Sequence, residues 1–117
     1  MTQFFKSVLD QDVSPIVICD LQHTILYMNP AAVKQYGPQL LGKNVLACHS
    51  PEACERIEQV LARFGLDDAC DRVHTMYSEK DALDVYMVAL RDEQGSLIGY
   101  YEKLESRRRD MTPLYQL

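Results

Sequence analysis

The sequence predicts an α+β domain in which a five-stranded antiparallel sheet carries helices on one face and is preceded by a short N-terminal helix. Three observations predict this fold class. Two short apolar runs lie at 16–21 and 25–29, a segment with helical periodicity fills the middle, and three strand-like runs follow one another at the end. Consecutive strands joined by short turns pair antiparallel, and helices grouped in one part of a chain pack on one side of such a sheet.

The first ten residues predict a short amphipathic helix. Its apolar residues recur at helical spacing: Phe4, Phe5, Val8 and Leu9. An isolated helix of this length is marginal in water, so its apolar side must pack on this domain or on a second copy of the chain. Ser14-Pro15 breaks the pattern, which confines the helical region to residues 1–13.

The apolar runs at 16–21 and 25–29 predict a hairpin, because about three polar residues separate them. His23 falls in this turn, where we expect it to be solvated. Asn29-Pro30 ends the second strand and begins a helix, since Asn caps helix N-termini and Pro suits the first helical position. Gly37-Pro38 ends that helix, and irregular or single-turn pieces follow.

The clearest helix in the sequence begins at Ser50-Pro51. Ser50 is a good N-cap, Pro51 suits the first turn, and Glu52 favours the positive end of the helix dipole. The side that faces the core is apolar: Cys54, Ile57, Val60, Leu61 and Phe64. We expect Gly65 to end the helix as its C-cap.

Three strand-like runs at 70–77, 83–91 and 97–104 predict an antiparallel meander, because the turn-like segments SEKDA and DEQGS separate them. The middle run is largely apolar on both sides: Leu83, Val85, Met87 and Ala89 alternate with Asp84, Tyr86, Val88 and Leu90. Both sides should therefore be covered, one by the helices and the other by the N-terminal helix or a partner subunit.

Composition and charge narrow the classes of function. The 117 residues, 47% of them hydrophobic and 25% charged, fit one globular domain. A net charge of −5 argues against a nucleic-acid partner. No apolar run approaches the roughly 20 residues that span a bilayer, and the N-terminus lacks the features of a signal peptide. We therefore expect a cytoplasmic protein with no membrane partner, whose four cysteines are thiols.

Three stretches carry a resemblance to a known family. SPIVICDLQHTILYMNPAAVKQYG is similar to a strand pair that ends in an Asn-Pro step, LLGKNV to the Gly-Lys/Arg step that follows it, and RDEQGSLIGYYE to a last hairpin. In this order they resemble the PAS domain family over residues 14–106. A basic tail over 107–117 follows, and Glu105 to Arg109 replace the Asp-Ile-Thr step that many members carry.

The resemblance implies a bacterial, non-catalytic sensory and dimerisation module in signal transduction. Such a module would bind a small ligand between sheet and helices and act through a signalling partner protein or a fused output domain. The chain also lacks the phosphate loop, nucleophile elbow and His-Glu-x-x-His helix of common enzyme classes, so we expect no catalytic residues. A purely structural dimerisation module without a ligand is an alternative.

Cys48 and His49, in GKNVLACHSPEAC, lie directly before the long helix and are similar to a Cys-His pair in a bacterial subgroup of the family. Structural zinc usually needs two short Cys/His pairs, so no metal is expected. The blue-light branch carries a cysteine directly after the Asn of this step, whereas Val45 follows Asn44 here, so flavin (FMN) is not expected. Haem held by His49 or Cys48, or thiol-based redox sensing through Cys48, stays an open alternative.

The remaining candidates come from elements that border a PAS pocket. The proposed ligand-binding set is Tyr27, Tyr36, Val45, Cys48, His49, Met76, Tyr86 and Tyr101. The same side chains also fit a filled core, and the sequence does not identify a ligand. A two-fold homodimer is expected to form through the N-terminal helix: Phe4, Phe5, Val8 and Leu9.

Overall fold

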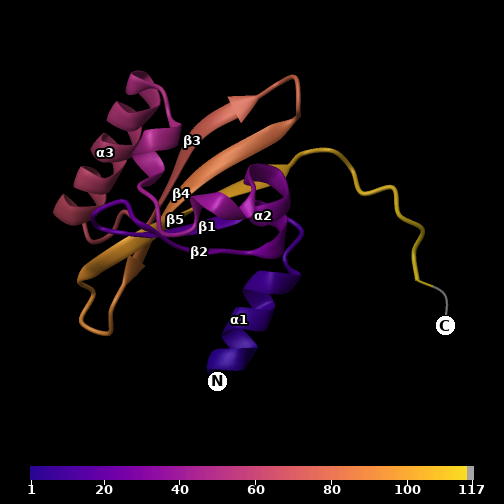
Figure 1. The fold of residues 1–117 in the computed structure, drawn as a ribbon, viewed down its shortest axis with the longest axis horizontal. Helices are drawn as coiled ribbons and strands as arrows, with labels where there is room; N and C mark the ends of the chain where they lie inside the picture. Colours follow the sequence, from indigo (N-terminus) through magenta and orange to yellow (C-terminus); the bar gives the residue numbers. More distant parts are fainter. Residues whose placement is uncertain (116–117) are drawn as a thin grey trace.

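A computed structural model describes residues 1–115 of the chain (Figure 1). One antiparallel sheet has the strand order β2-β1-β5-β4-β3. Its strands are β1 (Ile16–Asp20), β2 (Ile25–Met28), β3 (Arg72–Ser78), β4 (Leu83–Arg91) and β5 (Leu97–Ser106). The last three strands form the predicted meander, and β5 occupies the centre of the sheet. The predicted fold class is confirmed.

The helical elements also follow the predicted order. They are α1 (Thr2–Gln11), α2 (Pro30–Tyr36), α3 (Pro51–Leu66) and the single-turn 3-10 helices η1 (Pro38–Leu40) and η2 (Val45–Cys48). Figure 1 shows α1 projecting from the body of the domain and the segment after β5 running away from it. Residues 107–115 form no helix or strand, and the last two residues of the predicted basic tail lie outside the described range.

The cap residues explain where the two inner helices begin. The Asn29 side chain accepts a hydrogen bond from the Ala32 N–H at 3.0 Å, and the Ser50 hydroxyl accepts one from the Ala53 N–H at 3.2 Å. The prediction for the end of α3 was wrong. The helix continues to Leu66, because Gly65 does not take the left-handed conformation that a C-cap glycine provides.

The core lies between one face of the sheet, here called the inner face, and the helices α2 and α3. It is built from strand residues that alternate inward and from the apolar sides of the helices: Val17, Cys19, Ile25, Met28, Ala32, Val45, Ile57, Val60, Phe64, Met87 and Tyr100. Register shifts occur between Ile18 and Cys19 and between His74 and Met76. These shifts change which residues face inward on the two edge strands.

His23 is not simply solvated, as the hairpin position predicted. It is half-buried, and its Nδ1 lies 2.8 Å from the hydroxyl of Tyr100, which is fully buried on β5. A left-handed backbone (φ 66°) at His23 turns the chain. The hydrogen bond gives the buried Tyr100 hydroxyl the polar partner that it needs.

Asn29 connects α1, β1 and α2. It is fully buried, and its Oδ1 accepts hydrogen bonds from the Ile16 N–H at 2.9 Å and from the Ala32 N–H. Its amide nitrogen donates toward three backbone carbonyls at 2.9 to 3.3 Å: those of Leu9, Asp12 and Ser14. One side chain therefore holds the segment between α1 and the sheet in place.

No helix within residues 1–115 is long and apolar enough to cross a bilayer.

Candidate functional site

A cavity of about 150 Å³ lies between the inner face of the sheet and the helical segment from α2 to η2. Its apolar wall includes Val17, Met28, Leu40 and Leu104. Its polar wall is formed by Tyr36, Cys48, His49 and Glu102. A small apolar chamber with a few convergent polar groups is the usual form of a ligand site.

A second cavity of about 110 Å³ lies beside the first, under α3 and against β3 and β4. Arg56, Thr75 and Met76 contribute to its wall. His49 and Glu102 line both cavities and therefore stand between them. The two side chains are the natural centre of the candidate site.

The structure brings together five of the eight predicted ligand-binding residues. The first cavity is lined by Tyr36, Val45, Cys48 and His49, and the second by His49 and Met76. These contacts place the residues around the cavities, and their role in binding stays a prediction.

Three tyrosines were wrongly assigned to this site. Tyr27 and Tyr101 both pair with Ile18, which faces away from the cavity, and Tyr86 alternates on β4 with the buried Val85 and Met87. All three therefore lie on the opposite face, here called the outer face. The sequence pattern did not fix the register, and a shift of one residue moves a side chain to the other face.

The His49 ring is oriented by a hydrogen bond to a nearby backbone carbonyl. Its Nδ1 lies 2.7 Å from the Val45 carbonyl oxygen. Because a carbonyl only accepts hydrogen bonds, Nδ1 carries the proton, which leaves the lone pair of the neutral ring on Nε2. The nearby Cys54 thiol donates to the Leu46 carbonyl at 3.1 Å, so this turn is fixed by local hydrogen bonds.

Glu102 is the residue of the site that sequence reasoning missed. It lies on β5 opposite Met87 and Val17, with its side chain on the inner face. Burial raises the pKa of its carboxyl group, and the charges of His49, when its ring is protonated, and of Arg56 offset part of this effect. Burial also raises the pKa of Tyr36 to about 12, with a contribution from the Glu102 carboxylate. The Tyr36 hydroxyl is therefore protonated at neutral pH.

Replacing Glu102 with glutamine should stabilise the protein at neutral and alkaline pH. The folded chain holds the Glu102 proton more tightly than the unfolded chain. The folded protein therefore loses stability as the pH rises from the unfolded-state pKa of Glu102 through its folded-state pKa. Glutamine removes this ionisation. We expect Glu102→Gln to raise the free energy of unfolding by about 1–3 kcal/mol near pH 8, where a charged group lacks a partner, and by much less near pH 4.

Urea unfolding of the wild type and Glu102→Gln at both pH values measures this difference. Glu93→Gln is the matched control, because Glu93 is exposed in the turn between β4 and β5. A gain that is equal at both pH values, or equal to the gain of the control, would contradict the assignment of Glu102 as a half-buried titrating group.

The first cavity does not fit a large cofactor. Pockets for drug-sized ligands enclose about 300–1,000 Å³, and this cavity is about 150 Å³. A haem or flavin would have to displace η1, η2 or α3. At the position where the blue-light branch carries its cysteine, Val45 is buried in the cavity wall, and Cys48 is one 3-10 turn further on. Within residues 1–115, no three His, Cys, Asp or Glu side chains are placed to hold a metal ion.

The outer face carries a network of charged side chains near one end of β4 and β5. Asp84 is buried and forms an ion pair with Arg107, and one of its carboxylate oxygens lies 2.7 Å from the His74 Nε2. The Arg107 guanidinium, with a smaller effect of His74, lowers the pKa of Asp84. Arg107 also donates to the Tyr86 hydroxyl at 2.7 Å. The prediction of an apolar outer face on β4 is thus wrong for this part of the strand.

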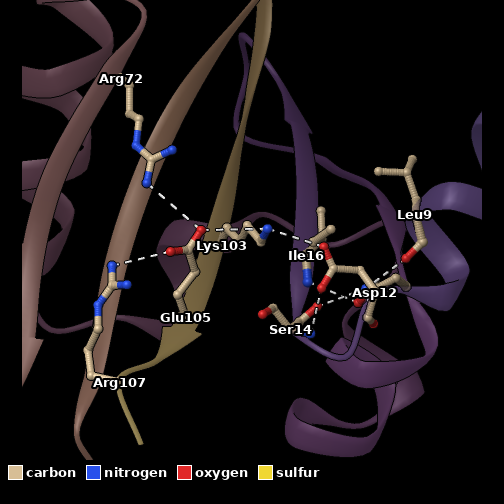
Figure 2. Close-up of polar contacts among 9 residues, drawn as sticks. Leu9, Asp12, Ser14, Ile16, Arg72, Lys103, Glu105 and Arg107 are labelled. Atoms are coloured by element: carbon tan, nitrogen blue, oxygen red, sulfur yellow. Dashed lines mark hydrogen bonds and ion pairs between the residues drawn. The ribbon is translucent and has the colours of Figure 1, made fainter. Parts of the chain in front are cut away.

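The network reaches the junction between α1 and β1. Figure 2 shows Lys103 between two carboxylates, with its Nζ 3.2 Å from Asp12 and 3.6 Å from Glu105. Glu105 also contacts Arg72 at 3.8 Å and Arg107 at 3.2 Å. Burial opposes the charge of Lys103, but the carboxylates of Asp12 and Glu105 outweigh it and raise the Lys103 pKa. Charged side chains therefore link the end of α1 to the end of β5.

The apolar side of α1 is not covered within one chain. Phe4, Phe5 and Val8 are 71%, 63% and 70% exposed, whereas Leu9 is half-buried. The helix is held at its C-terminal end, where Asp10 accepts a hydrogen bond from the Tyr27 hydroxyl and Asn29 bonds the Leu9 carbonyl. Three large apolar side chains on a fixed, projecting helix form a surface suited to a protein contact.

Comparisons with known proteins agree on the fold. A family model described as the PAS fold matches residues 9–108. The C-terminal domain of a protein from Streptococcus mutans has a TM-score of 0.72 at 21% identity and covers 90% of this chain and 84% of its own. A PAS domain from Colwellia psychrerythraea has a TM-score of 0.68 at 18% identity, with coverages of 90% and 95%.

A sensory box sensor histidine kinase structure from Vibrio cholerae has a TM-score of 0.61 at 14% identity, with coverages of 88% and 89%. At these identities the likeness is one of fold alone. No curated protein matches the chain in sequence.

Proposed function

The chain belongs to the PAS family, whose members are typically sensory modules of signal transduction, and from this membership and the cavity geometry we propose that it is a non-catalytic, ligand-binding sensory domain. The ligand site is the cavity centred on His49 and Glu102, with Tyr36, Val45, Cys48 and, in the second cavity, Met76 around it. The domain acts through a signalling partner or a fused output domain. Its four free thiols fit a reducing compartment such as the cytoplasm.

The main support for this proposal is that successive side chains of β5 point to opposite faces of the sheet. Glu102 and Leu104 line the first cavity, while Lys103 between them contacts Asp12 on the outer face. The Leu104 N–H also bonds the Pro15 carbonyl at 3.3 Å. A displacement of β5 by a ligand would therefore act directly on the segment that holds α1.

A second connection leaves the same cavity through β2. Met28 lines the cavity wall, and the next residue is Asn29, which hydrogen-bonds the Leu9 carbonyl at the end of α1. Two strands, β5 and β2, which lie on either side of β1, thus join the cavity to the same helix. The proposed signal is a change in how firmly α1 is held.

The proposed output surface is α1 in a homodimer. Phe4, Phe5 and Val8 would pack against a second copy around a two-fold axis, with Leu9 at the edge of the contact. Burying each large apolar side chain contributes about 1.5–3 kcal/mol. The exposure of these side chains and the position of α1 outside the core support this assignment.

Hydrogen–deuterium exchange with a filled cavity tests the coupling. Val45→Phe adds a ring in the cavity wall and thus imitates an occupant. We expect backbone amides of residues 2–11 to change their exchange rate by at least about threefold in Val45→Phe, because the hold on α1 changes. The added Lys103→Met substitution should remove most of this response, since it breaks the contact with Asp12.

A dispersed amide NMR spectrum confirms that each variant is folded. Unchanged exchange in α1 in a folded Val45→Phe protein would contradict the coupling. A response that is equally large with Lys103→Met would show that β5 does not carry it.

A further inference from the structure

The first cavity presents hydrogen-bond acceptors of Glu102 and of the neutral His49 ring to a ligand. From this arrangement we propose that the ligand is a small, single-ring or short-chain molecule that donates hydrogen bonds through N–H or O–H groups. This inference rests on the proposed function, because it names the chemical class that the same cavity recognises. It concerns Glu102 and His49, the two residues that line both cavities.

Glu102 provides the stronger acceptor. Its carboxyl group lies at both cavities, and within residues 1–115 it accepts no hydrogen bond from a protein donor. A carboxylate in this position has lost part of its hydration without gaining a donor from the protein. A ligand N–H or O–H would supply that donor, whereas a ligand without one would leave the carboxylate unpaired.

His49 provides a second acceptor in the same place. Its Nδ1–H is used by the Val45 carbonyl at 2.7 Å, so the neutral ring offers the lone pair of Nε2. The Tyr36 hydroxyl is protonated at neutral pH and can donate or accept a hydrogen bond, so it can pair with either a donor or an acceptor of the ligand. Two acceptors and one adaptable hydroxyl favour a ligand whose polar end carries donors.

The size of the cavity limits the apolar part of the ligand. An apolar cavity of about 150 Å³ in another protein binds benzene or xenon, and the first cavity here has about the same volume. Its Val17, Met28 and Leu40 side chains suit one ring or a short hydrocarbon chain. A larger ligand requires that Glu102 or His49 moves so that the second cavity joins the first.

The test compares probes of one size that differ in their polar group. Aniline and phenol carry a ring and a donor, toluene has the ring without a polar group, and benzaldehyde has an acceptor in its place. Each is titrated into the full chain at neutral pH, and amide NMR shifts of the cavity residues give the dissociation constant. We expect aniline and phenol to bind at least about tenfold more tightly than toluene and benzaldehyde, which corresponds to about 1.4 kcal/mol.

Glu102→Leu should reduce this ratio to about twofold or less, because the main acceptor is gone. Glu105→Leu is the matched control on the same strand and should keep the ratio, since Glu105 lies on the outer face. If the Glu102→Leu protein does not fold, the relative affinities of the four probes for the wild type still test the donor class.

Toluene or benzaldehyde binding as tightly as aniline would overturn the donor class while leaving the cavity as a ligand site. A preference for donors that survives in folded Glu102→Leu would overturn the role of Glu102. If no probe shifts the cavity residues at millimolar concentration, both this inference and the ligand-binding part of the proposed function are wrong.

Discussion

Replacing Asn29 with alanine is expected to lower the free energy of unfolding by about 3–4 kcal/mol, because several hydrogen bonds are lost in the core at once. The buried Ile16 and Ala32 N–H groups would lose their acceptor. The Leu9 carbonyl and its neighbours would lose the donor that joins α1 to the sheet. Chemical denaturation, followed by circular dichroism, measures the effect.

Asn44→Ala is the control for this prediction. Asn44 also caps a helical turn, since its side chain accepts a hydrogen bond from the Leu46 N–H at 2.8 Å, but it is exposed. We expect this substitution to cost about 0.5–1 kcal/mol, as for an ordinary exposed cap. Equal losses for the two variants would show that Asn29 acts as a cap alone and does not tie α1 to the domain.

Two charges on α1 are expected to convert the proposed homodimer into a monomer. In Phe4→Glu/Phe5→Glu each protomer loses two exposed aromatic side chains and gains two carboxylates that would meet their copies across the two-fold axis. We expect the dissociation constant to rise at least about 100-fold, because the apolar burial is lost and like charges are brought together. Light scattering after size-exclusion chromatography measures the mass.

The matched control places the same charges on the polar side of α1. Gln3→Glu/Ser7→Glu changes two exposed polar residues of the helix and should leave the dimer intact. A monomeric wild-type protein at high micromolar concentration, or a dimer unaffected by Phe4→Glu/Phe5→Glu, would contradict the assignment of α1 as the interface.

The order of helices and strands could be predicted from the sequence because local residue patterns mark where the elements begin. Asn29-Pro30 and Ser50-Pro51 each combine a side-chain cap with a proline that needs no N–H donor, and both helices begin there. The end of α3 was less well determined. Gly65 permits a left-handed C-cap conformation without requiring it, and the helix continues one residue further, to Leu66.

The faces of the strands could not be read in the same way. On β5 both sets of alternating residues contain a charged side chain, Glu102 on one side and Lys103 on the other, so polarity did not show which set faces inward. On β3 the register shift before Met76 places this residue on the inner face beside Val85, although His74, two residues earlier, lies on the outer face. An extra residue of this kind leaves no clear sequence signal.

The central claim is that the cavity around His49 and Glu102 is a ligand site, and native mass spectrometry of protein purified without refolding tests it most directly. We expect a non-covalent small-molecule mass on the wild-type chain that is absent from folded Val45→Phe, whose added ring occupies the same space. Bare chain masses from every preparation of both proteins, or an added mass that Val45→Phe retains in full, would contradict the claim.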